Sequence, residues 1–157
     1  MTLPENSAPN SFVLMQLGER RFALPANIVT ELAPPVRLHT FPHASPLVSG
    51  VIVRRSRIVP VYDASSVLTG RQASVHRFYL IARREFAKGS ELSAIPVDGE
   101  CELGTGTMQP PPAGKPSYVA GVLPLGEESL DVLNFEVLVT SQPVNAATHP
   151  NSQEAQP

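Results

Sequence analysis

The clearest pattern along the chain is a pair of apolar runs separated by a short polar stretch. Residues 51–53 are apolar, residues 54–57 (Arg-Arg-Ser-Arg) are polar, and residues 58–62 are mostly apolar again. This arrangement is typical of a tight β-hairpin. Asp63 follows as a favoured helix N-cap, and Gly70 stands where a helix commonly ends in a left-handed residue. The stretch therefore predicts a strand, a turn, a second strand and a short capped helix.

The same unit occurs twice in the chain. At an offset of about 71 residues, two long segments align without a gap, which is the signature of an internal repeat. The central matches are Gly50-Val51 with Gly121-Val122 and Glu31-Leu32 with Glu102-Leu103. Further matches keep a proline, an apolar residue or an N-cap: Leu24 with Ile95, Pro25 with Pro96, Val61 with Val132, and Asp63 with Asn134. We therefore expect a pseudo-twofold domain built from two related halves.

The rest of the pattern predicts further short strands. Seventeen prolines and ten glycines argue against long helices. Residues 83–90 read as a long polar hairpin loop, and residues 1–11 and 141–157 are expected to be a disordered lead and a disordered tail around one domain at residues 12–140. The expected strands are 12–17, 22–24, 29–32, 36–38, 78–82, 92–96, 118–125 and 130–133, with a helical turn at 26–28 and a short helix at 134–139.

Composition narrows the classes of function. The net charge of −2, the absence of tryptophan and an aromatic content of 6% give no electrostatic footprint and few stacking rings for nucleic acid. The single cysteine, Cys101, excludes an intramolecular disulfide and fits a reducing compartment. No apolar run approaches the ~20 residues of a membrane span, and the N-terminus lacks the pattern of a signal peptide. We expect a soluble, cytoplasmic protein.

Residues for catalysis or metal binding are sparse. His39 and His43 lie in a proline-broken loop with no third ligand nearby in sequence, so surface histidines are the better interpretation. Cys101 stands between Glu100 and Glu102, whose negative charge is expected to raise the thiol pKa and oppose thiolate formation. There is no phosphate loop, nucleophile elbow or dinucleotide fingerprint. The sequence predicts a protein that is not an enzyme and has no cofactor or metal.

The arginine turn at residues 54–57 is the most distinctive polar feature. The carboxylate of Glu31, from the preceding β unit, is placed to pair with Arg54 or Arg55. An exposed pair contributes only about 0–1 kcal/mol, so its role would be to shape a surface. The second half has Gly126-Glu127-Glu128 at the equivalent turn. Such asymmetry on a symmetric scaffold suggests a site for a partner.

These stretches resemble the CheW-like domain family, the adaptors of bacterial chemosensory arrays, over about residues 12–140. The resemblance rests on FALPANIVTEL (22–32), on Gly50 to Asp63 with the Pro-Val-Tyr-Asp ending, on AIPVDGECEL (94–103) and on Gly121-Val122 with LNFEVL (133–138). It implies an all-β fold of two small five-stranded β-barrels around a shared hydrophobic core. Val53, Arg54 and Ser56 replace the family's usual Asn, Leu and Gly, and Ser suits the left-handed position of a type I′ turn less well than Gly.

The resemblance also implies a function. Members bridge the cytoplasmic tip of a chemoreceptor, which docks in the apolar groove between the barrels, to the regulatory domain of a CheA-type histidine kinase, which meets the barrel ends. On this basis the partner-binding residues are expected to be Glu31, Arg54, Arg55 and Arg57 with the apolar Val29, Leu32, Leu38 and Ile52.

Two other functions stay open at this stage. A small β-barrel could bind another protein, nucleic acid or an oligosaccharide, and salt-dependent binding to single strands would favour that alternative. An enzyme using Cys101 or the histidine loop would lose its activity in Cys101→Ala or His43→Ala.

Overall fold

The fold is built from ten short strands and three short helical segments in the described part of the chain. A computed structural model describes residues 10–40, 42, 48–70 and 78–140. The elements of the first half are β1 (Asn10–Leu17), β2 (Arg20–Pro25), η1 (Ala26–Ile28), β3 (Val29–Ala33), β4 (Val48–Arg54), β5 (Arg57–Tyr62) and α1 (Ser65–Thr69). Those of the second half are β6 (Phe78–Phe86), β7 (Gly89–Val97), β8 (Glu102–Gly106), β9 (Val119–Leu125), β10 (Glu128–Leu133) and α2 (Phe135–Thr140).

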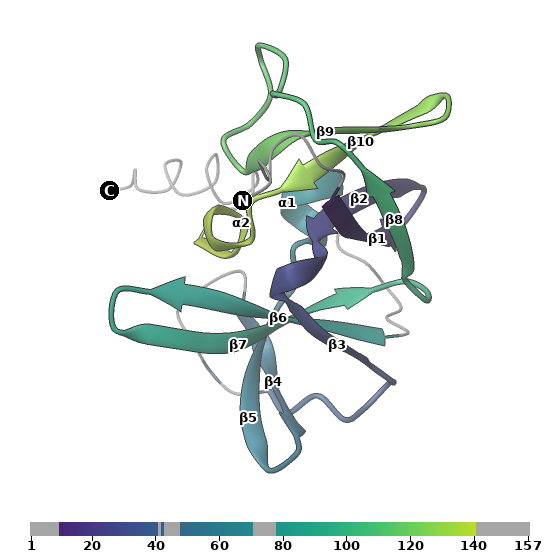
Figure 1. Ribbon diagram of the computed structural model, residues 1–157. Coiled ribbons are helices and arrows are strands. Elements are labelled where there is room, and N and C mark those ends of the chain that lie inside the picture. The colour runs from purple at the N-terminus through teal and green to yellow at the C-terminus, as the bar shows by residue number, and fades with distance from the viewer. Residues whose placement is uncertain (1–9, 41, 43–47, 71–77, 141–157) are drawn as a thin grey trace, which may run out of the picture.

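The strands form two five-stranded sheets, each curled into a half-barrel, as Figure 1 shows. Sheet A has the order β8-β1-β2-β10-β9, and sheet B has the order β3-β6-β7-β5-β4. Each sheet takes two strands from one half of the chain and three from the other. Exchanging the halves converts one order into the other, so the predicted pseudo-twofold repeat and two-lobed all-β fold are confirmed.

The repeat is closest in the two hairpins that it first identified. Strands β4 and β5 span 48–54 and 57–62, while β9 and β10 span 119–125 and 128–133, at the same offset. The starts of the helices after them differ. Asn134 accepts the Val137 N–H at 3.1 Å, whereas the N-cap of α1 is Ala64 and not the expected Asp63, whose side chain accepts the Ser65 N–H at 3.1 Å just before the helix. Gly70 ends α1 with φ 79°, as its position predicted.

The described core has three clusters, and β1, which is buried on both faces, contributes to two of them. Phe12 and Leu14 point into a small cluster within sheet A, whereas Val13, Met15 and Leu17 face the other way. That second set joins the largest cluster, which lies between the sheets and includes residues of both helices. A third cluster fills the curl of sheet B. Burial of the shared cluster is what joins the two lobes into one body.

Some expected boundaries were wrong. Residues 36–38 form no strand, and only an isolated bridge between His39 and Val51 pairs this segment with β4. The expected polar loop at 83–90 is shorter, because β6 and β7 pair as far as Phe86 and Gly89 and only two residues form the turn. Polar residues can continue a strand when alternate positions face solvent. The polar composition of residues 83–90 therefore did not reveal that both strands extend into this stretch. The expected disordered lead ended too late, because residues 10 and 11 begin β1. Residues 1–9, the expected disordered tail at 141–157 and His43 lie outside the described residues.

The arginine turn adopts the type I′ geometry that its sequence disfavours. Arg55 and Ser56 have φ values of 52° and 68°, and among the described residues they are the non-glycine residues with positive φ. Left-handed backbone costs a residue with a Cβ about 1–2 kcal/mol. The hairpin is therefore held by its surroundings against a local backbone preference.

We expect Ser56→Gly to raise the free energy of unfolding by up to about 1 kcal/mol, since glycine adopts the left-handed conformation without this strain. Urea denaturation of the variant and the parent measures the difference. Glu127→Gly is the matched control, because Glu127 holds the equivalent position without a positive φ and gains only unfolded-state flexibility. Equal effects of the two changes would show that strain at Ser56 is negligible.

Candidate functional site

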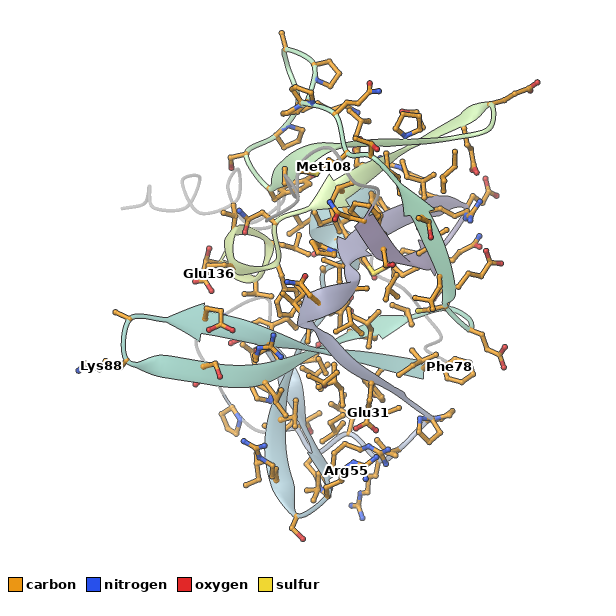
Figure 2. All side chains as sticks on the ribbon, in the orientation of Figure 1. Glu31, Arg55, Phe78, Lys88, Met108 and Glu136 are labelled. Carbon is orange, nitrogen blue, oxygen red and sulfur yellow. The ribbon has the colours of Figure 1, made fainter. Side chains whose placement is uncertain are left out.

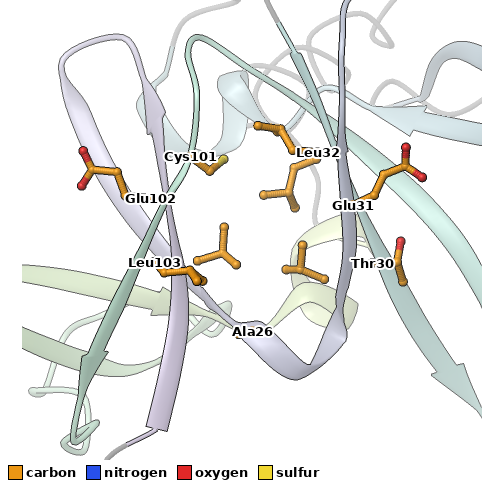
Figure 3. Close-up of a pocket in the computed structure, with 10 residues that line it drawn as sticks. Ala26, Thr30, Glu31, Leu32, Cys101, Glu102 and Leu103 are labelled. Carbon is orange, nitrogen blue, oxygen red and sulfur yellow. The ribbon is translucent and has the colours of Figure 1, made fainter.

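A groove runs between the two lobes, where the edge strand β3 of sheet B faces the edge strand β8 of sheet A. Its cavity measures about 270 Å³. Figure 3 shows Leu32 and Leu103 on its opposite walls and Ala26 at its base. The lining residues are mostly apolar: Val13, Ala26, Val29, Thr30, Glu31, Leu32, Leu80, Cys101, Glu102 and Leu103.

The groove lies on the pseudo-twofold axis of the fold. Glu31-Leu32 and Glu102-Leu103 are equivalent in the repeat, and both pairs line it. Val13 and Leu80 are also equivalent, because they pair with Leu24 and Ile95, which the repeat matches. The symmetry breaks at the surface: Leu32 packs partly buried against the shared core, whereas Leu103 is 76% exposed. The β8 wall of the groove therefore has an exposed leucine side chain, whereas the equivalent leucine of the β3 wall is packed against the core.

Glu31 joins the groove to the arginine hairpin. Its carboxylate Oε2 accepts hydrogen bonds from Arg54, from Nε at 3.0 Å and from Nη2, and its Oε1 accepts one from Arg55 Nε at 3.3 Å. Figure 2 shows Glu31 and Arg55 together at the β4–β5 end of the molecule. Since β3 and β4 are the two edges of sheet B, this ion pair closes the half-barrel.

Hydrogen bonding from Arg54 lowers the pKa of Glu31 below its ordinary value of 4.5, against the opposing effect of burial. Because the folded-state pKa is the lower one, the stabilisation is complete above pH about 4.5 and is lost as pH falls through the folded-state value. The pair is therefore fully formed at neutral pH.

The outer face of the same hairpin is exposed and apolar. Val53 and Ile58 are paired across β4 and β5, and they are 51% and 71% exposed. Arg55 in the turn and Arg57, which precedes Ile58, are also exposed. Ile52, which we expected to contact a partner, points to the opposite face and is fully buried, so that assignment was wrong. The period-2 alternation of strands places Ile52 inward and its neighbour Val53 outward.

The remaining expected residues have mixed positions. Val29 and Leu32 line the groove and are partly buried, while Leu38 packs against the sheet B cluster away from the groove lining. Arg57 lies opposite Arg54 in the hairpin and has no ion pair among the described residues. The sequence interpretation missed Val53, Ile58 and Leu103. Strand alternation could have identified the first two, and the match of Leu103 to Leu32 could have identified the third.

In sheet A, the place equivalent to the contact between Glu31 and the arginine hairpin has the opposite balance of charge. Arg21 bonds to Glu128 on the hairpin strand β10 at 2.7 Å and to Glu102 on the edge strand at 3.4 Å. One guanidinium thus bridges two carboxylates, and Glu127 at the turn is exposed. The two ends of this symmetric scaffold therefore present opposite charge.

In the described part of the chain, the residues that could bind a metal ion or act in catalysis do not form a cluster. Among residues 10–40, 42, 48–70 and 78–140 no group of three or more His, Cys, Asp or Glu could hold a metal ion. Burial raises the pKa of Cys101 to about 11, so the cause is burial and not the neighbouring glutamates that we had expected to act.

No helix among residues 10–40, 42, 48–70 and 78–140 is long and apolar enough to cross a membrane.

Labelling of Cys101 by a disulfide reagent is expected to be slow at pH 8 and to quicken about tenfold per pH unit until near pH 11, because only the thiolate reacts. The rate is followed by absorbance on the folded protein and on protein unfolded in urea. The unfolded chain should instead level off near the ordinary thiol pKa of about 8.5. Identical pH profiles would show that the groove does not shield this thiol.

Comparison with known proteins agrees with this architecture. A structural match is the crystal structure of the scaffolding protein TtCheW from Thermoanaerobacter tengcongensis, with a TM-score of 0.71 and 21% identity, covering 83% of this chain and 92% of that one. At this identity the match shows a shared fold. No curated protein matches the sequence. The family model of the CheW-like domain matches residues 11–142, which is most of the chain. The protein therefore belongs to the CheW-like domain family.

Proposed function

We propose that this protein is a non-enzymatic adaptor that couples the cytoplasmic tip of a chemoreceptor to the regulatory domain of a CheA-type histidine kinase. One observation carries the proposal: two surfaces of different chemistry, the groove and the arginine hairpin, occur on one packed body and meet at Glu31. A coupling protein needs two such surfaces at once. In this function the protein is cytoplasmic and is recruited to receptor arrays at the membrane.

The groove is the proposed receptor site. Its apolar walls suit the apolar face of an amphipathic helix, which buries side chains spaced three and four residues apart. Val29 and Leu32 form part of one wall, and the exposed Leu103 stands on the other. Because the groove lies on the pseudo-twofold axis, its two walls present similar backbone to the two antiparallel helices of a receptor tip.

The arginine hairpin is the proposed kinase site. Val53 and Ile58 supply an exposed apolar centre, and Arg55 and Arg57 supply positive charge at its border. An apolar centre with a polar rim is the usual composition of a protein interface. Glu31 and Arg54 fix the hairpin to β3, so that this surface is rigid before the kinase docks.

Arg55→Glu is expected to weaken binding of the kinase regulatory domain at least about tenfold, because it reverses charge at the border of the site. Isothermal titration with the regulatory domain of the CheA-type kinase from the same genome measures the loss. The melting temperature should fall only slightly, since Arg55 is 75% exposed and makes one long hydrogen bond.

Leu103→Asp is the matched control for this experiment. It places a charge in the groove and is expected to weaken binding of a receptor cytoplasmic fragment while sparing the kinase domain. Each variant should therefore weaken binding of one partner and leave binding of the other unchanged. Absence of kinase binding by the parent protein, or the same loss of both partners in both variants, would contradict the proposed two-site adaptor.

A further inference from the structure

Two arginines compete for one carboxylate at the β4–β5 hairpin, and they hold it unequally. Arg54 donates two hydrogen bonds to Glu31 Oε2, and its side chain is 24% exposed. Arg55 donates one bond to Oε1 at 3.3 Å, and its side chain is 75% exposed. The hairpin register explains the difference, because Arg54 lies in the last strand position while Arg55 lies in the turn. Arg54 is thus the principal partner of Glu31.

The charges at this corner do not balance. The hairpin carries three guanidinium groups, those of Arg54, Arg55 and Arg57, and the single carboxylate of Glu31 pairs with the first two. At the equivalent corner of sheet A the ratio is reversed, since one guanidinium bridges Glu102 and Glu128. The surplus positive charge belongs to the two exposed arginines. It borders the apolar pair Val53 and Ile58, where a partner surface with carboxylates at its edge would be complementary.

We propose that Arg54 is a positioning residue which, by holding Glu31, leaves the guanidinium of Arg55 available for a carboxylate of the docked partner. This rests on the proposed adaptor function, in which the partner is the kinase regulatory domain. Without Arg54, Arg55 is the remaining guanidinium bonded to Glu31, and its side chain turns to that carboxylate. Binding then weakens although Arg55 is still present.

The test is a suppressor experiment with the kinase regulatory domain as the titrant. Arg54→Gln is expected to weaken binding about tenfold, the effect of losing one charge-assisted contact. Adding Glu31→Gln should restore affinity to within about threefold of the parent, because removing the carboxylate frees Arg55 again. Removing both members of the pair also leaves no half-buried charge without a partner, since Arg55 is 75% exposed, so the double variant is expected to fold.

The alternatives give different results. If Arg54 itself contacted the kinase, the double variant would bind no better than Arg54→Gln, and the proposal would be overturned. Arg57→Gln is the matched control, because it removes the same charge from the same hairpin but has no bond to Glu31. Glu31→Gln should not suppress the loss caused by Arg57→Gln.

A second measurement needs no partner. In NMR spectra of the free protein, the Nε–H of Arg55 should exchange with water more slowly in Arg54→Gln than in the parent, because its bond to Glu31, long in the parent at 3.3 Å, tightens once Arg54 is removed. An unchanged exchange rate would refute the positioning role. If the kinase domain bound none of these proteins, the adaptor function would fail, while this signal would still decide what Arg54 does.

Discussion

Alanine in place of Gly50 is expected to lower the free energy of unfolding by about 3 kcal/mol or more, the largest loss that we expect from a single methyl group in this protein. A Cβ at this position would lie 2.4 Å from the carbonyl oxygen of His39. That oxygen cannot move away freely, because it accepts the Val51 N–H at 2.9 Å, and the His39 N–H donates to Val51 at 2.8 Å. The φ of Gly50, 155°, adds strain for any residue with a side chain.

The repeat predicts the same requirement at Gly121. Its Cβ would lie 2.6 Å from the carbonyl oxygen of Gln109, which accepts the Val122 N–H, and 2.5 Å from Met108 Cγ. The Met108 side chain can rotate, and the φ of Gly121 carries no penalty, so we expect a smaller loss of about 2 kcal/mol. Gly99→Ala is the control, because nothing lies within 4 Å of its added methyl. Thermal melts showing equal losses at the three positions would contradict this explanation.

These two glycines show what the repeat did and did not predict. The match of Gly50 with Gly121 was visible in the sequence, but its cause was not. Each glycine allows a crossing segment to bridge an edge strand, β4 or β9, whose outer N–H and C=O groups would otherwise be unpaired. The partner residues, His39 and Gln109, lie in segments that read as loops. A contact between a strand and a distant loop leaves no periodic pattern, so only the structure identifies it.

The candidate site was predictable to the extent that it depends on strand alternation and the repeat. The pairing of Glu31 with Arg54 and Arg55 followed from the arginine turn, and the structure contains both bonds. Ile52 was misassigned because an apolar run such as residues 51–53 does not reveal which face is buried. The exposed partner on that strand is Val53. An apolar groove was expected from the family resemblance alone. Its lining could not be derived from the sequence pattern, because the walls come from the edge strands of two different sheets.

Arg84 links the two lobes. It lies in residues 83–90, which the sequence pattern predicted to be a polar loop. It lies on β6 of sheet B and donates hydrogen bonds to both carboxylate oxygens of Glu136, from Nε at 3.1 Å and from Nη2 at 3.2 Å. Its Nη1 donates to Tyr62 Oη at 3.2 Å, and its guanidinium lies 5.7 Å from the centroid of that ring. Glu136 belongs to α2, which follows the last strand of sheet A. With 11% of its side chain exposed, Arg84 is the least exposed arginine among those with an ion pair in the described residues.

Arg84→Ala is therefore expected to lower the free energy of unfolding by about 2–3 kcal/mol, because it removes a bidentate ion pair and a bond to Tyr62 and leaves a void beside the ring. Urea denaturation measures the loss, and hydrogen exchange should show faster opening of α2, which Arg84 ties to sheet B. Arg83→Ala is the matched control: the adjacent residue is 37% exposed and pairs with Glu85, so about 0–1 kcal/mol is expected. If the two variants lost stability equally, or if α2 kept its protection without Arg84, Arg84 would have no special part in joining the lobes.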